Sequence, residues 1–180
     1  MLFKAFSKDV QVKGQNIIIY LGGMGAFEMM GRDILQKHNI DKNPQPDVWY
    51  NHQNFLDAMK EISERTGKST VMTIGMRVAA NASYSAEIKN MEQALGELNK
   101  SYHKVHKGDT HTTKIITKMN ENIYKVVINS PYPCGFDMGY LRGLVKRFAP
   151  QQFVIVTHDE EQGCRTDGGE SCTYLIRVTT

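Results

Sequence analysis

The spacing of apolar residues changes near residue 110, and this change constrains the fold more than any other feature of the sequence. Before it, apolar residues recur every three or four positions, as on amphipathic helices. After it, Thr112–Met119 and Ile123–Asn129 are typical of two strands joined by a turn, and Phe136–Phe148 is typical of a helix. The last strands are expected at Phe153–Thr157 and Thr173–Val178. Several helices followed by a β-β-α-β-β antiparallel sheet indicate a single α+β domain.

The first 110 residues are expected to hold a hairpin and four helices. The hairpin strands are predicted at Val10–Val12 and Asn16–Tyr20, because Lys13-Gly14-Gln15 between them is typical of a turn. The helices predicted by apolar spacing are Ala26–Lys37, Asn51–Arg65 (ended by Gly67), Thr70–Ala80 and Ala86–Lys107 (between a Ser85 cap and Gly108). Further along, Gly139 and Gly143 lie four residues apart and would let a neighbouring backbone approach closely.

Length and composition narrow the class of protein. The chain has 180 residues, of which 41% are hydrophobic and 23% charged, as expected for one ligand-binding domain spanning residues 1–180. The net charge of +3 is spread along the chain without a basic block, which argues against a nucleic-acid partner. No apolar run approaches the roughly 20 residues of a membrane helix, and the first residues lack a secretory leader. A cytoplasmic location is therefore expected.

Three cysteines fall at the ends of predicted elements. Cys134 precedes the Phe136 helix, Cys164 lies in the loop after the Phe153–Thr157 strand, and Cys172 precedes the last strand. With Glu161 from the same loop, they would offer a closed tetrahedral set of the kind found in structural zinc sites. His158 is an alternative fourth ligand. A Cys164–Cys172 disulfide and three unrelated buried thiols remain open as other interpretations.

Two stretches, 129–143 (Asn-Ser-Pro-Tyr-Pro-Cys-Gly-Phe-Asp-Met-Gly-Tyr-Leu-Arg-Gly) and 158–174 (His-Asp-Glu-Glu-Gln-Gly-Cys to Ser-Cys-Thr-Tyr), resemble the 4-vinyl reductase domain. Its superfamily also holds haem-based nitric-oxide sensors and Golgi transport-complex subunits. The domain is similar to the sensor half of phenol-responsive bacterial activators, which bind zinc through one cysteine before a helix and a Glu-x2-Cys-x7-Cys run. This resemblance implies the ligand set Cys134, Glu161, Cys164 and Cys172.

The resemblance also implies a function. It predicts a small-molecule-binding regulatory domain, often a homodimer, which would pass its signal to another chain because no ATPase module or helix-turn-helix is evident. Vinyl-reductase activity is not expected, because no nucleotide or flavin motif supplies hydride. No catalytic residue is assigned. A metal-dependent enzyme or reductase-associated protein stays an alternative, if the metal keeps an open coordination position.

Two histidines give a second alternative, a haem-binding gas or redox sensor. On the predicted Ala86–Lys107 helix, His106 falls within the apolar stripe and His103 near its edge. His106 is interpreted as a core histidine, a polar anchor in a pocket, or a haem ligand. The haem sensors of the superfamily carry a Tyr-x-Ser-x-Arg motif; here Ser130 matches its serine, but Ile128 and Tyr132 replace its tyrosine and arginine.

The preferred hypothesis is a sensor with a structural zinc site and an apolar pocket between the long helix and the sheet. The pocket would take a small apolar or aromatic ligand. The residues predicted to line it are Trp49, Phe55, Met59, Tyr102, His106 and Tyr132.

Overall fold

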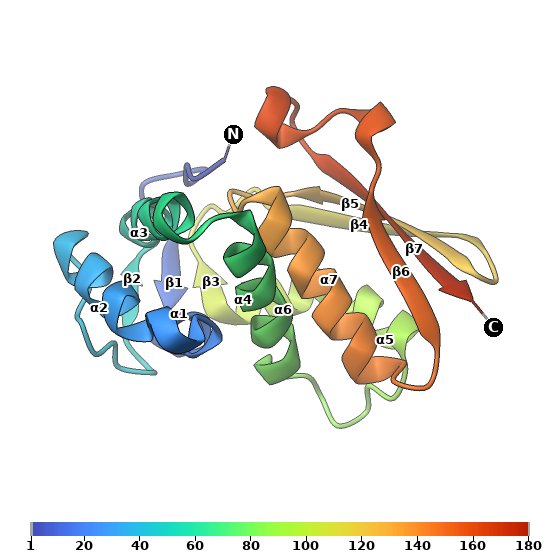
Figure 1. Cartoon of the computed structure of the whole chain (residues 1–180), viewed down its shortest axis with the longest axis horizontal. Helices are drawn as coiled ribbons and strands as arrows, with labels where there is room; N and C mark the ends of the chain where they lie inside the picture. The colour runs from blue at the N-terminus through green and yellow to red at the C-terminus, as the bar shows by residue number, and fades with distance from the viewer. Residues whose placement is uncertain (1, 180) are drawn as a thin grey trace.

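Helices make up most of the N-terminal part and an antiparallel sheet most of the C-terminal part in the computed structural model, which describes residues 2–179 (Figure 1). Together they form a single α+β domain, as predicted. The helices are α1 Gly14–Gly23, α2 Glu28–Lys37, α3 His52–Thr66, α4 Lys68–Asn81, α5 Met91–Gly96, α6 Leu98–Val105 and α7 Cys134–Phe148. Short 3-10 turns lie at η1 Gly25–Phe27, η2 Glu160–Gln162 and η3 Arg165–Asp167.

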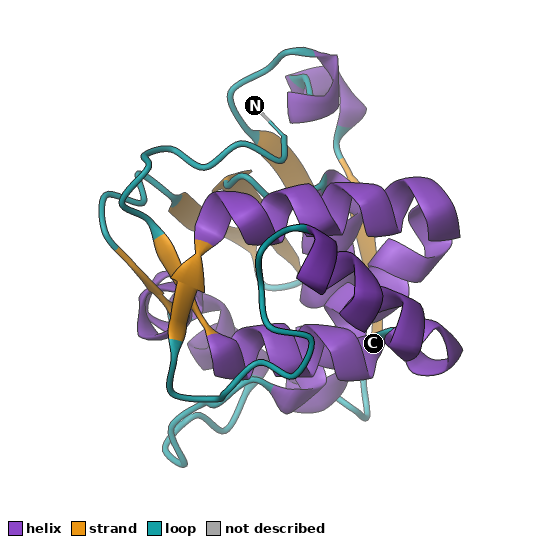
Figure 2. Ribbon diagram, turned by 90° about the vertical axis from the view of Figure 1, so that its left-hand side faces the viewer, coloured by secondary structure: helices purple, strands orange, loops and turns teal. Residues whose placement is uncertain are grey.

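The larger sheet has the strand order β4-β5-β7-β6 and is antiparallel throughout. Its strands are β4 Thr113–Asn120, β5 Ile123–Asn129, β6 Phe153–His158 and β7 Cys172–Thr179. On the inner face Val126 pairs with Tyr174, and both are buried. The helices lie in front of this sheet in the view of Figure 2. The predicted β-β-α-β-β order is confirmed. Burial alternates most regularly along β5, where every second residue is buried, as expected for a strand with one face toward the core.

The predicted N-terminal hairpin is wrong. Residues 16–20 lie in α1, and β1 (Gln11–Lys13) pairs instead with two distant strands, β2 (Trp49–Asn51) and β3 (His106–Lys107). The β-branched Ile17–Ile19 run favours a strand locally. Burial decides otherwise, because Ile17, Tyr20 and Leu21 are buried at the three- and four-residue spacing of a helix.

The predicted long helix Ala86–Lys107 is also wrong. Asn90 caps α5 by accepting a hydrogen bond from the Gln93 backbone N–H at 2.9 Å, so the helix begins there rather than at Ser85. The helix is interrupted at Glu97, which separates α5 from α6. At the other end, His106 leaves the helix to pair with Val12 in the small sheet. Strand pairing therefore overrides the helical spacing at the position where the candidate histidine lies.

Helices α4 and α7 touch through their backbones and lie side by side in Figure 1. A Cβ added at Gly139 would lie 2.0 Å from the Met72 carbonyl oxygen, and one at Gly143 would lie 2.3 Å from that of Met76. The close approach predicted for these two glycines is thus observed. Gly75 on α4 matches them: its added Cβ would lie 2.3 Å from a carbonyl of α7.

This helix pair joins two hydrophobic cores. The first is formed mainly by α1 to α4 with Tyr102, Tyr132 and Phe136. The second lies between α7, α5, α6 and the larger sheet. No helix within residues 2–179 is long and apolar enough to span a bilayer.

We expect Gly139→Ala to lower the free energy of unfolding by about 1–3 kcal/mol or more, because the methyl group has no room beside a rigid backbone carbonyl. Gly135→Ala in the same helix is the matched control, since its added Cβ would meet nothing closer than 3.8 Å. Urea denaturation of both variants measures the difference. Equal stability of the two variants would contradict the backbone contact.

Candidate functional site

His106 is the first residue of β3, and this junction between α6 and the small sheet turns its ring into the protein, where it is 3% exposed. The Tyr102 ring stacks on it with 3.9 Å between centroids and 7° between planes. Its Nδ1 lies 2.9 Å from the Tyr102 carbonyl oxygen, and its Nε2 lies 2.6 Å from the Tyr132 hydroxyl. Both ring nitrogens are therefore occupied.

The hydrogen bonds fix the tautomers of this cluster. A carbonyl only accepts, so Nδ1 of His106 carries the proton and Nε2 accepts from the Tyr132 hydroxyl. The Tyr132 oxygen then accepts from Nε2 of His52 at 3.2 Å. His52 is 1% exposed, and its Nδ1 has no hydrogen-bond partner among the described residues. His52, His106 and Tyr132 thus form a neutral, fully buried polar cluster.

Burial keeps the two histidines neutral. It lowers the pKa of His52 to about 4. It also lowers the pKa of His106 well below the ordinary value, and a charge on nearby His52 would lower it further. Histidines that bind metals commonly have Nδ1–H on a carbonyl and a lone pair on Nε2, which is the arrangement of His106.

A cavity of about 90 Å³ adjoins this cluster. Of the six residues predicted to line a pocket, Tyr102, His106 and Tyr132 do line it, together with Phe136, Tyr140, Lys114 and others. Trp49, Phe55 and Met59 do not. Phe55 and Met59 are buried in the first core, and Trp49 packs under the Lys107 ammonium at 4.6 Å. His103 is exposed and does not line the cavity.

Two charged side chains at this cavity were missed from the sequence. Lys114 on β4 places its Nζ 5.0 Å from the centre of the Tyr102 ring and 5.6 Å from that of Tyr140. Asp137 on α7 is 5% exposed and pairs with the buried Arg165. Burial raises the pKa of Asp137, and the Arg165 charge opposes that shift. Nothing in the local sequence signals these roles, because the partners are far apart along the chain.

Arg165 connects the cavity wall to the cysteine loop. Its Nη2 bonds Asp137, its Nη1 donates to the Ser130 hydroxyl at 2.8 Å, and its Nε lies 3.3 Å from the Cys172 sulfur. Arg165 is only 3% exposed. The positive charge of its buried guanidinium is therefore compensated by the Asp137 carboxylate rather than by water.

The cysteines meet at one end of the larger sheet. Cys134 begins α7, Cys172 begins β7, and Cys164 precedes η3. Their sulfurs lie 3.0 to 3.4 Å apart and are not bonded to each other, so the Cys164–Cys172 disulfide does not form. The pKa of Cys172 is lowered to about 3, first by its hydrogen bond with Cys134 and then by Arg165.

His158, at the end of β6, is the fourth member of this group. Its ligand atom and the three sulfurs all lie within 4.8 Å of one another. Its Nε2 is buried without a hydrogen-bond partner among the described residues. Glu161, the fourth ligand implied by the resemblance, is exposed in η2 and lies outside the group. The geometry therefore brings together Cys134, Cys164, Cys172 and His158.

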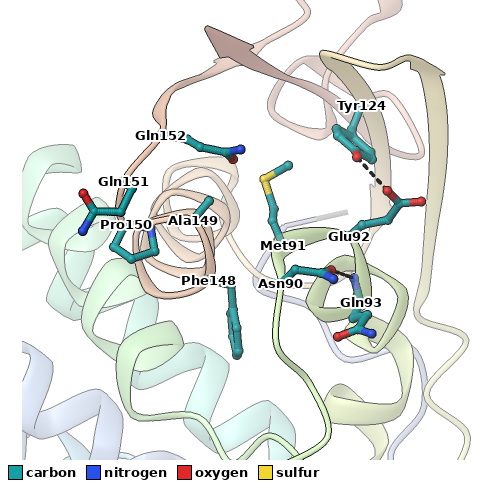
Figure 3. Close-up of a pocket in the computed structure, with 10 residues that line it drawn as sticks. All are labelled: Asn90, Met91, Glu92, Gln93, Tyr124, Phe148, Ala149, Pro150, Gln151 and Gln152. Carbon is teal, nitrogen blue, oxygen red and sulfur yellow. Dashed lines mark hydrogen bonds between the residues drawn. The ribbon is translucent and has the colours of Figure 1, made fainter. Parts of the chain in front are cut away.

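A larger open hollow of about 580 Å³ lies between the end of α7 and the start of α5 (Figure 3). Side-chain amides, Pro150 and Met91 line much of it, and the Tyr124 hydroxyl donates to Glu92 at 2.9 Å. It contains no histidine or cysteine. We therefore take two features as the candidate site: the partly open cavity at His106, and the cluster of Cys134, Cys164, Cys172 and His158, called the thiol group below.

Solved structures of H-NOX domains share this fold. An H-NOX protein from S. oneidensis in the Fe(II)NO ligation state is 17% identical with a TM-score of 0.69, covering 93% of this chain and 99% of that one. An unliganded Fe(II) H-NOX protein from K. algicida is 13% identical with a TM-score of 0.67, covering 93% and 97%. No family model and no curated protein matches the chain. At these identities the likeness establishes the fold alone.

The buried histidines should make the protein less stable in acid. Unfolded His52 binds a proton near pH 6.5 but folded His52 only near pH 4, so the free energy of unfolding falls as the pH drops through this window. At pH 5 the loss from His52 is about 2 kcal/mol. His52→Gln should weaken this pH dependence, as measured by urea denaturation at several pH values. The exposed His111 is the control, and an equal effect of His111→Gln would contradict the prediction.

Proposed function

We propose that this chain is a small-molecule-binding sensor domain whose ligand site is the cavity at His106. The observation that carries the proposal is the neutral cluster of His52, His106 and Tyr132 beside a partly open cavity that His106 and Tyr132 line. Buried titratable groups with strongly shifted pKa values at a cavity are typical of functional sites. The fold supports the same function, because the H-NOX structures it resembles include NO-bound and CO-bound states.

The fold likeness supports the haem-binding alternative better than a zinc-containing vinyl-reductase type of sensor, since no finding is specific to the latter family. One related structure concerns the modulation of haem redox potential through porphyrin distortion. The chemistry of His106 would also suit iron if Tyr132 moved away, because Nδ1 is held by a carbonyl and the lone pair is on Nε2, where it now accepts from the Tyr132 hydroxyl. The other candidate, His103, is exposed.

The space in front of His106 does not fit a porphyrin. The Tyr132 hydroxyl lies 2.6 Å from Nε2, where an iron ligand would be, and the cavity of about 90 Å³ is well below the ~300 Å³ of ordinary cofactor pockets. Tyr132 also replaces the arginine of the haem-sensor motif, and Ile128 replaces its tyrosine. The residues therefore favour a ligand smaller than haem. Haem could bind His106 only if the Tyr132 side chain moved away from Nε2.

The spectrum of the protein mixed with haemin separates these two candidates. Wild-type protein should show no Soret shift, because Tyr132 blocks Nε2 of His106. Tyr132→Gly should bind haemin and give a shifted Soret band, which the double variant with His106→Ala should lose. A shifted Soret band with wild-type protein that is lost in His106→Ala would contradict the small-ligand proposal and support the haem-binding alternative.

We further propose a structural zinc ion at the thiol group. Three cysteines and one histidine are a common closed zinc set, and His158 offers a buried nitrogen that has no other partner among the described residues. Backbone N–H groups of Arg165 and Thr166 approach the sulfurs of Cys172 and Cys164 at 3.4 and 3.3 Å, as expected around thiolates. A metal-dependent enzyme would need an open position, which His158 would fill.

Metal analysis tests this set of ligands. Wild-type protein should contain about one zinc per chain. Cys164→Ser and His158→Ala should lose zinc and lower the melting temperature, because a closed metal site contributes folding energy. Glu161→Ala is the matched control and should retain the zinc and the wild-type melting temperature. Loss of zinc in Glu161→Ala but not in His158→Ala would favour the ligand set implied by the resemblance. Unchanged zinc in Cys164→Ser would contradict the site. Dimerisation and a downstream signalling partner stay predictions of the resemblance.

A further inference from the structure

The cavity at His106 has an excess of positive charge. Lys114 lines the cavity as a cation, and Asp137 is the one carboxylate among the lining residues. Arg165 lies behind the wall and pairs with Asp137, while His106 in the wall and His52 behind it are neutral. Two positive charges and one negative charge leave a balance of +1. The exposed Lys104 at the rim adds to this balance. Partly buried charges are costly without compensation, so the excess points to a missing anion.

Lys114 has no ion-pair partner within 4 Å of its Nζ among residues 2–179. The Asp137 carboxylate acts on Lys114 from a longer distance and favours its charged form, but its Oδ2 is engaged by Arg165 and by Ser130 at 3.1 Å. The rings of Tyr102 and Tyr140 offset only part of its charge. Burial lowers the pKa of Lys114 to about 8, which leaves the ammonium largely protonated at pH 7.

The size and the walls of the cavity limit the anion. Its volume of about 90 Å³ is less than the ~150 Å³ that holds benzene in an engineered cavity, so a single small ring requires a slight shift of side chains. Tyr102, Tyr132 and Phe136 provide aromatic walls beside the ammonium. The cavity therefore combines a small aromatic space with one unpaired positive charge.

We propose that the ligand is a small organic monoanion, a carboxylate with at most one ring, whose charged oxygen binds the Lys114 ammonium. This inference rests on the proposed function and specifies its ligand class. It also names Lys114 as the residue that selects acids over neutral molecules of the same shape. A carboxylate could also come from haem, and the experiment distinguishes the two sources.

Acetate and benzoate, with acetamide and benzamide as neutral counterparts, are the probes, titrated at pH 7 and followed by calorimetry and thermal shift. At least one acid should bind, and its amide should bind about tenfold more weakly or worse. Lys114→Met should reduce the affinity for the acid by about ten- to a hundredfold. Lys118→Met on the same strand is the matched control, because Lys118 pairs with Glu92 and Glu121 away from the cavity.

A second measurement does not depend on a variant. Binding of the acid to wild-type protein should weaken as the pH rises through about 8, where Lys114 loses its proton. The Lys118→Met control should keep this dependence.

Each other outcome overturns the inference. If acid and amide bind equally and Lys114→Met has no effect, the ligand need not be an anion, and the proposed function is unaffected. Absence of binding by all four probes would overturn the small-acid ligand. A haemin complex of wild-type protein that depends on His106 would identify haem as the source of the carboxylates.

Discussion

The backbone contact between α4 and α7 is the constraint on which the rest of the structure depends. Gly75, Gly139 and Gly143 let the two helices approach until carbonyl oxygens of one lie where the side chains of the other would be. This contact sets the position of α7, whose first turn carries Cys134 toward the thiol group and Asp137 toward the cavity. Tyr132, two residues before α7, is brought onto His106 by the same placement.

The thiol group and the cavity are linked through Arg165. Its guanidinium touches the Cys172 sulfur on one side and Asp137 of the cavity wall on the other. A buried ion pair of this kind is costly to break, because removing one partner leaves an uncompensated charge. A metal ion in the thiol group would thus hold the loop that positions Arg165, and Arg165 would in turn neutralise Asp137. The proposed metal site and the proposed ligand site are thus connected through the side chain of Arg165.

The sequence predicts the larger sheet and most helices because their burial patterns are local. The secondary-structure predictions fail where contacts with distant segments of the chain determine the local conformation. Ile17–Ile19 favours a strand until the first core buries one side of α1, and His106 is drawn out of its helix by Val12. The three cysteines were recognisable from their places at element ends. His158 could not be preferred over Glu161, and Lys114, Arg165 and His52 gave no signal, since their roles depend on partners far away in the chain.

The central claim is that His106 is a neutral histidine whose Nε2 accepts a hydrogen bond from Tyr132 at a ligand cavity. Nitrogen NMR of the histidine side chains tests this most directly, because it reports which ring nitrogen carries the proton. The account predicts a proton on Nδ1 and none on Nε2 of His106 at neutral pH, with a change in the Nε2 signal in Tyr132→Phe. A proton on Nε2, a charged ring, or a signal broadened by bound iron would contradict it.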